Sequence, residues 1–147
     1  MPTYVKSAIT IVVLTLLAGC TTSPISAGKA KAVPSDRITY LSPDNASSSI
    51  TVTRDTGWIA GGGCYVGVLI DGKLAARLAT GETVTFRVTE GRHILGMSGD
   101  PMGKGLCGLE IGQSIKESSA DLKQGEAQRF RISGDTSSGL DLRPTSL

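Results

Sequence analysis

The stretch Cys64-Tyr-Val-Gly-Val-Leu-Ile70, followed by Asp71-Gly72, decides the fold of this chain. Its first seven residues are apolar on both faces, which predicts a strand in the centre of a sheet. Asp-Gly is a preferred dipeptide of two-residue hairpins, because both positions tolerate a positive φ. We therefore expect residues 73–79 to return antiparallel to this strand.

Short strands separated by turn residues extend in both directions from this hairpin. Between Thr83 and Thr89, apolar and polar residues alternate, so that Val84, Phe86 and Val88 share one face of a half-buried strand. The chain also contains 19 glycines, which suit turns between strands better than helices. The same reasoning predicts further strands at residues 38–41, 49–53, 92–97, 113–122, 127–133 and 139–143. The pattern as a whole predicts an all-β domain.

The first 20 residues have the organisation of a bacterial secretory signal. Lys6 precedes an apolar run, and Leu17-Ala18-Gly19-Cys20 follows it. The apolar run is too short for the roughly 20 residues that a spanning helix needs. A plain secretory signal with an accidental cysteine is the alternative.

Leu17-Ala18-Gly19-Cys20 resembles the lipobox of bacterial lipoproteins at all four positions. The resemblance implies cleavage before Cys20, a diacylglycerol on its sulfur and acylation of the new amine. Thr21 stands where an aspartate would resemble an inner-membrane retention signal, so we expect an outer-membrane anchor facing the periplasm. The chain then divides into a signal peptide (1–19), a lipidated cysteine with a polar, flexible tether (20–36) and a β domain (37–147).

The cysteine count gives a second expectation. The chain has three cysteines, and lipidation would use Cys20. Cys64 and Cys107 remain as an even pair in an oxidising compartment, which predicts a disulfide between them. Two buried thiols are the alternative. The pair and the lone His93 cannot supply four ligands to a structural zinc ion, and we expect no cofactor.

Charge and motifs limit the classes of function. Without Lys6, 14 basic and 13 acidic side chains remain, so we expect no nucleic-acid partner. His93 has no nucleophile or orienting acid placed beside it by the sequence, and we expect a structural histidine and no enzyme. Gly61-Gly62-Gly63 and Gly103-Lys104 lack the spacing of a phosphate-binding loop.

The run from Tyr65 to Leu95 resembles the PEGA-type β module. The shared outline comprises Asp71-Gly72-Lys73, Gly81-Glu82 and Glu90-Gly91-Arg92-His93, each between short strands. A family of uncharacterised bacterial lipoproteins has one such domain, followed by a turn and strand like those that begin at Gly125-Glu126. The likeness covers roughly Ile50 to Ile132 and implies an immunoglobulin-type antiparallel β-sandwich. It carries over no catalytic residues.

Two kinds of partner are compatible with these features, besides the membrane itself. In the first, the sandwich binds or supports an envelope component, such as a protein or peptidoglycan. In the alternative it inhibits a cell-wall hydrolase such as lysozyme, with the glycine-rich loop Gly99–Gly105 as the inserting element. The candidate partner-binding residues are Trp58, Asp100 and Lys104. Trp58 suits an interface anchor, although packing in the core or at its rim is the alternative.

Overall fold

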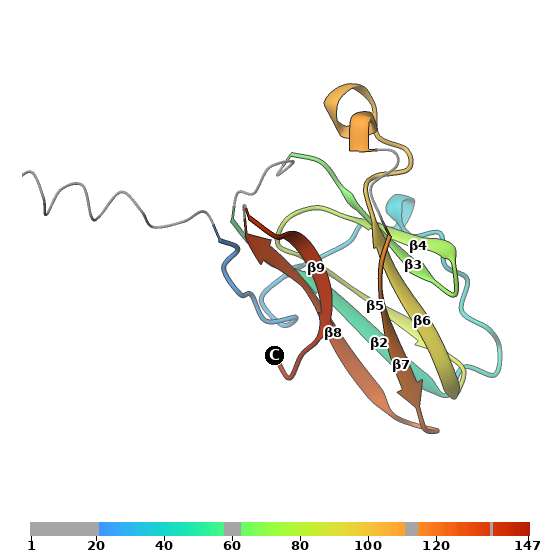
Figure 1. Ribbon diagram of the computed structural model, residues 1–147. Helices are drawn as coiled ribbons and strands as arrows, with labels where there is room; N and C mark the ends of the chain where they lie inside the picture. The colour runs from blue at the N-terminus through green and yellow to red at the C-terminus, as the bar shows by residue number, and fades with distance from the viewer. Residues whose placement is uncertain (1–20, 58–62, 111–114, 136) are drawn as a thin grey trace, which may run out of the picture.

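The chain folds into two β-sheets that pack on each other as a sandwich (Figure 1). The computed structural model describes residues 21–57, 63–110, 115–135 and 137–147, and the backbone alone at 109–110. The strands are β1 (Lys31–Ala32), β2 (Ser48–Arg54), β3 (Val66–Ile70), β4 (Lys73–Leu78), β5 (Glu82–Val88), β6 (Gly91–Ser98), β7 (Lys116–Leu122), β8 (Ala127–Asp135) and β9 (Gly139–Pro144). The predicted all-β sandwich is confirmed.

The strand order separates the sandwich into a five-stranded and a four-stranded sheet. The first has the order β1-β5-β2-β8-β9 and the second the order β4-β3-β6-β7. Most neighbours are antiparallel, but β2 pairs with β8 in parallel, and so does β1 with β5. The sandwich is therefore antiparallel in most of its pairings and mixed at these two. The chain visits the other sheet between β2 and β8, and such a crossover connection permits parallel neighbours.

The central hairpin forms where the sequence predicts it. β3 lies between β4 and β6 and is buried along most of its length. Asp71 and Gly72 have φ angles of 51° and 78°, which are the two positive values of a type I′ turn. Asp71 is the only non-glycine residue with a positive φ in the described part of the chain.

One hydrophobic core lies between the sheets. In β5, Val84, Phe86 and Val88 are buried, whereas Thr85 and Arg87 are exposed. The other sheet contributes side chains such as Leu95 of β6. Burying each large aliphatic or aromatic side chain contributes about 1.5–3 kcal/mol, so this alternation is the main source of stability.

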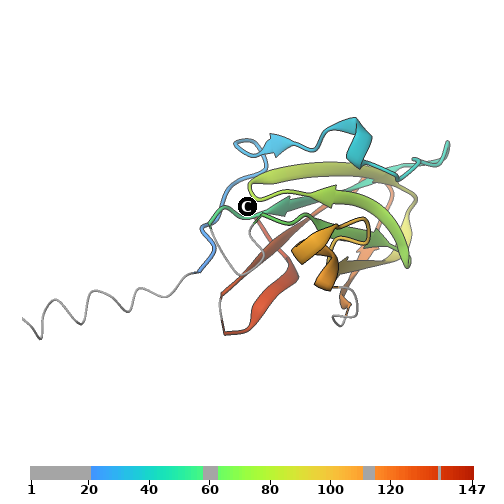
Figure 2. The same cartoon turned by 90° about the horizontal axis from the view of Figure 1, so that it is seen from above.

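The segment expected as a flexible tether instead packs on the sandwich. We call residues 21–36 the strap, and Figure 2 shows it along one edge of the molecule. Its β1 pairs with β5, the Ser23 N–H donates to Thr56 O (2.8 Å), and Val33 is buried in the core. The outer edge of β5 carries unpaired backbone groups that a polar segment can satisfy. The folded domain therefore includes residues 21–36 and does not begin at residue 37.

One other segment differs from the sequence prediction, and a second has a structure that the sequence did not predict. Residues 38–41 form no strand but one isolated bridge, from Ile38 to Ala76, after the 3-10 helix η2 (Ser35–Arg37). Residues 105–110 form a second 3-10 helix, η3 (Gly105–Glu110), on the connection between β6 and β7. In the described residues, no helix is long and apolar enough to cross a membrane.

Candidate functional site

The strap starts at one particular end of the sandwich. At this end β2, β4, β6 and β8 finish, and β3, β5, β7 and β9 begin. Thr21 forms a bridge with Asp135, and Ser23 forms one with Thr56. The Thr22 N–H also donates to Gly134 O (3.0 Å). We call this end the strap end, and it contains most of the residues singled out by the sequence.

A disulfide joins Cys64 to Cys107 at the strap end, as predicted. Their Cα atoms lie 5.3 Å apart. The bond ties the β6–β7 connection to the residues that precede β3. At Gly103 the backbone of this connection folds tightly on itself, since an added Cβ would lie 2.7 Å from Cys107 O. We call residues 99–110, whose tip is held by this bond, the disulfide loop.

Asp100 anchors the disulfide loop and does not present a free charge. It is 3% exposed, and Arg77 of β4 donates two hydrogen bonds to its carboxylate, at 2.7 and 2.6 Å. The Arg77 guanidinium holds the pKa of Asp100 below its usual range, and the N–H of Met102 acts in the same direction. Of the three candidate partner-binding residues, Lys104 is exposed and Trp58 lies outside the described residues.

A row of charged side chains on either side of Tyr65, which we call the Tyr65 row, runs from Asp100 in the disulfide loop to Glu82. The guanidinium carbons of Arg77 and Arg37 lie 4.9 and 4.4 Å from the centre of the Tyr65 ring. Arg37 donates to both carboxylate oxygens of Glu82, at 2.8 and 2.6 Å. The row therefore joins η2, the residue before β3, β4, the start of β5 and the loop. The residues of this row are far apart in the chain, and no sequence motif predicts that they lie together.

A cavity of about 430 Å³ lies beneath the disulfide loop. The disulfide, the Arg77–Asp100 pair and Lys104 line it, together with Gly63, Tyr65, Met102 and Gly103. The structure thus brings Asp100 and Lys104 together with the predicted disulfide.

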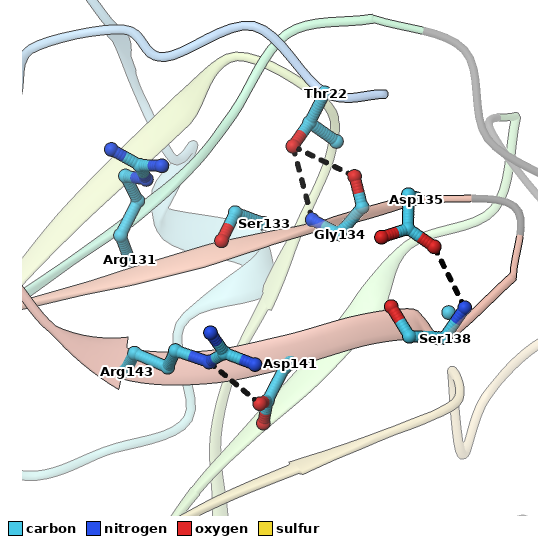
Figure 3. Close-up of a pocket in the computed structure, with 9 residues that line it drawn as sticks. Thr22, Arg131, Ser133, Gly134, Asp135, Ser138, Asp141 and Arg143 are labelled. Atoms are coloured by element: carbon cyan, nitrogen blue, oxygen red, sulfur yellow. Dashed lines mark hydrogen bonds and ion pairs between the residues drawn. The ribbon is translucent and has the colours of Figure 1, made fainter. Parts of the chain in front are cut away.

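A smaller, polar cavity of about 260 Å³ lies between the start of the strap and the β8–β9 hairpin (Figure 3). Arg131 of β8 and Arg143 of β9 are cross-strand neighbours. Each lies beside a carboxylate, since Arg131 Nε is 3.2 Å from Asp55 Oδ2 and Arg143 Nε is 2.8 Å from Asp141 Oδ2. Both arginines are therefore already paired within the protein, and the Asp135 carboxylate accepts hydrogen bonds from Ser137 and Ser138.

Asp55 is the most buried charged side chain at the strap end. Its Oδ2 accepts a hydrogen bond from Thr22 Oγ1 (3.3 Å), whereas Oδ1 has no hydrogen-bond partner in the described part of the chain. Burial raises the pKa of Asp55, although Arg131, Thr22 and the nearby N–H of Ile25 act in the opposite direction.

His93 lies at the other end of the sandwich, beside an acid that the sequence did not place there. Its Nδ1 is 2.8 Å from Asp71 Oδ2, and its Nε2 is 3.1 Å from the main-chain oxygen of Thr89. A carboxylate and a carbonyl oxygen can only accept, so Nδ1 must carry a proton to bond Asp71, and Nε2 must carry one as well to bond the Thr89 oxygen. It then cannot take a proton from the Thr89 hydroxyl, 3.4 Å away. Through His93, the Asp71-Gly72 turn is held against the turn that follows Thr89.

No protein-family model, curated protein or solved structure matches the chain. Within the described residues, no group of three or more His, Cys, Asp or Glu side chains is placed to hold a metal ion. The functional argument therefore depends on the N-terminal motif and on the geometry of the strap end.

Proposed function

We propose that the protein is a lipoprotein of the bacterial envelope, anchored by acyl chains on Cys20, whose non-catalytic sandwich binds or supports an envelope component. The observation that carries the proposal is the fixed position of Thr21, the residue after the lipobox cysteine. Its bridge to Asp135 attaches the start of the mature chain directly to the folded domain. The anchor would therefore hold the sandwich itself against the membrane.

The cysteines support this assignment. The Cys64–Cys107 disulfide is compatible with an extracytoplasmic domain, and it leaves Cys20 as the one cysteine for modification. Each buried CH₂ contributes about 0.8 kcal/mol to membrane attachment, so a single acyl chain holds a protein only reversibly. Three chains on Cys20 would make the attachment lasting. We place the anchor in the outer membrane, facing the periplasm, because Thr21 replaces the retention aspartate.

Metabolic labelling with palmitate tests the anchor. We expect the wild-type chain to incorporate label and to remain in the membrane fraction, and Cys20→Ala to do neither. The Cys64→Ala/Cys107→Ala variant is the matched control, because it removes cysteines without touching the lipobox and should still label. Label on Cys20→Ala would show that Cys20 is not the site.

Crosslinking in intact cells tests the second half of the proposal. With the lipidated protein as bait, we expect an envelope protein or a peptidoglycan fragment to be recovered, and the Cys20→Ala variant to lose it. Recovery of nothing above the level of the Cys20→Ala control would contradict a binding role.

Inhibition of a cell-wall hydrolase such as lysozyme is the second candidate. The observation in its favour is the disulfide loop, which projects from the sandwich (Figure 1) and exposes Lys104 and Leu106. A stoichiometric loss of lysozyme activity, relieved by Leu106→Asp, would support this candidate. Full lysozyme activity at excess protein would exclude it.

A further inference from the structure

We infer that the disulfide loop is a membrane-contact surface, whose Met102 and Leu106 side chains enter the headgroup boundary of the bilayer that holds the anchor. This inference depends on the proposed lipid anchor at Cys20. It deepens that proposal by assigning an orientation to the sandwich and a lipid occupant to one of its surfaces.

The first step is the position of the anchor relative to the fold. Thr21 is fixed by Asp135, and the next two residues are fixed by Gly134 and Thr56. One extended residue spans at most about 3.6 Å, so the lipidated cysteine has almost no freedom to lift the domain. The strap end must therefore lie at the membrane surface.

The second step is that the disulfide loop belongs to the same end. β6 finishes at Ser98 and β7 begins at Lys116, where these strands pair with the start of β3 and with each other. Arg54, at the end of β2, donates to Cys64 O (2.7 Å) and so links the strap side to the disulfide. Figure 1 shows η3 at the top of the molecule and the start of the strap at its left side, about halfway down.

The third step is the chemistry that the loop exposes. Leu106 is 82% exposed and Met102 is 60% exposed. Five large apolar side chains are strongly exposed in the described residues, and three of them lie between β6 and β7, since Ile115 is the third. Single exposed apolar residues are ordinary, but a group on one connection marks an interaction surface. Moving a leucine out of water contributes about 1.5–3 kcal/mol.

The fourth step is that the loop is built to keep this shape. The disulfide, the buried Asp100–Arg77 pair and the tight packing at Gly103 hold it from three sides. A preorganised surface loses little conformational entropy on contact. Lys104 is exposed on the same loop, and a basic side chain near an anionic leaflet adds about 1 kcal/mol.

A protein partner is the competing occupant of this loop. The position of the anchor favours the bilayer, because a loop pressed against the membrane is closed to a large hydrolase. The envelope component would then meet the sheet faces or the opposite end of the sandwich.

Fluorescence of the full lipidated protein in vesicles tests the inference. Trp58 is the only tryptophan, so Trp58→Phe provides a silent background for Leu106→Trp. The matched control is Leu41→Trp, because Leu41 is 89% exposed and lies near β4 residues at the far end from the strap. The vesicles contain phosphatidylethanolamine and phosphatidylglycerol, part of it with brominated acyl chains.

We expect brominated lipid to remove about half of the indole emission of Leu106→Trp and to shift the remainder to shorter wavelength, since apolar faces at membrane surfaces lie roughly 5–10 Å deep. Emission of Leu41→Trp should not change. A non-reducing gel confirms the disulfide in both variants. Equal quenching in both variants, or in neither, overturns the inference.

Flotation of the same vesicles separates this inference from the proposed function. Wild-type protein that floats, together with an unquenched Leu106→Trp indole, overturns the membrane contact alone. Wild-type protein that fails to float overturns the lipid anchor and the inference with it. An unquenched indole, combined with lysozyme binding that Leu106→Asp abolishes, would assign the loop to a protein partner.

Discussion

Removal of the Cys64–Cys107 disulfide should destabilise the domain by about 4 kcal/mol. The bond closes a loop with a sequence separation of 43 residues. On the chain-entropy treatment, a closed loop of this length restricts the denatured state by about 4 kcal/mol at 25 °C. Domains are typically stable by about 5–15 kcal/mol, so the loss takes a large share of the total.

Both cysteines should be replaced by alanine, so that no unpaired thiol remains. The native loop keeps other attachments in the variant, chiefly the Arg77–Asp100 pair and the hydrogen bond from Arg54 to the carbonyl of residue 64. The cost should therefore come mainly from the denatured state, which expands once the cross-link is absent. The m-value should increase accordingly, because more surface becomes accessible on unfolding.

Urea unfolding of the chain from Thr21 onward measures both quantities. This part of the chain contains the whole described core. Reduced wild-type protein is the control, and it should unfold with the same midpoint as the double variant. A loss below about 1 kcal/mol with an unchanged m-value would refute the reasoning, because the denatured state would then be restricted by something other than the bond.

Three further predictions concern buried or paired acids, each measured as a free energy of unfolding against pH. Glu82→Gln should cost about 3 kcal/mol at pH 7, since it breaks the buried pair with Arg37. Burial raises the pKa of Glu82, but Arg37 and the Ala79 N–H lower it further, so the net pKa is below its usual value. The stability deficit of the variant should therefore shrink below about pH 4, and a pH-independent deficit would contradict this prediction. Asp71→Asn keeps a side chain that tolerates the positive φ, and it should cost about 1 kcal/mol by weakening the hydrogen bond to His93. Burial raises the pKa of Asp71, but that bond and the Ile94 N–H lower it overall, so the wild type should lose its extra stability in acid. Equal stability of the two proteins at pH 7 would count against the contact. Asp55→Asn should show the opposite pH dependence, because burial raises the pKa of Asp55. The wild type should lose stability relative to the variant as the pH rises above about 4. A stability difference between the two proteins that does not change with pH would argue against a buried carboxylate.

Local signals in the sequence predicted the parts of the fold that local physics controls. The Asp71-Gly72 turn follows from the tolerance of both residues for a positive φ. The inward face of β5 follows from strict alternation of apolar and polar residues. The Cys64–Cys107 bond follows from the cysteine count, because setting the lipobox residue Cys20 aside leaves one pair.

The features that the sequence did not reveal depend on contacts between distant segments. The strap has no apolar period. Its attachment uses main-chain hydrogen bonds, which any sequence can make, together with the Thr22 hydroxyl and the one buried side chain of the strap, Val33. The residues of the Tyr65 row lie close together in the fold but far apart in the chain, so no local pattern predicts their contact. Asp100 looked like a loop acid available to a partner, but its burial against Arg77 could be known only from the packing.

With the proposed anchor at Cys20, the strap would limit how far the sandwich can reach from the membrane. A flexible tether of 16 residues would let the domain sample a wide shell, since the end-to-end distance of such a chain grows as about 5–6 Å times the square root of its length. A strap that is hydrogen-bonded from Thr22 onward removes that freedom. The seven residues of β2 span about 23 Å, so the far end of the sandwich would stand at roughly that height above an anchored strap end. With the proposed anchor, a partner would therefore have to come to the membrane surface, because the sandwich would have no tether on which to move out to it.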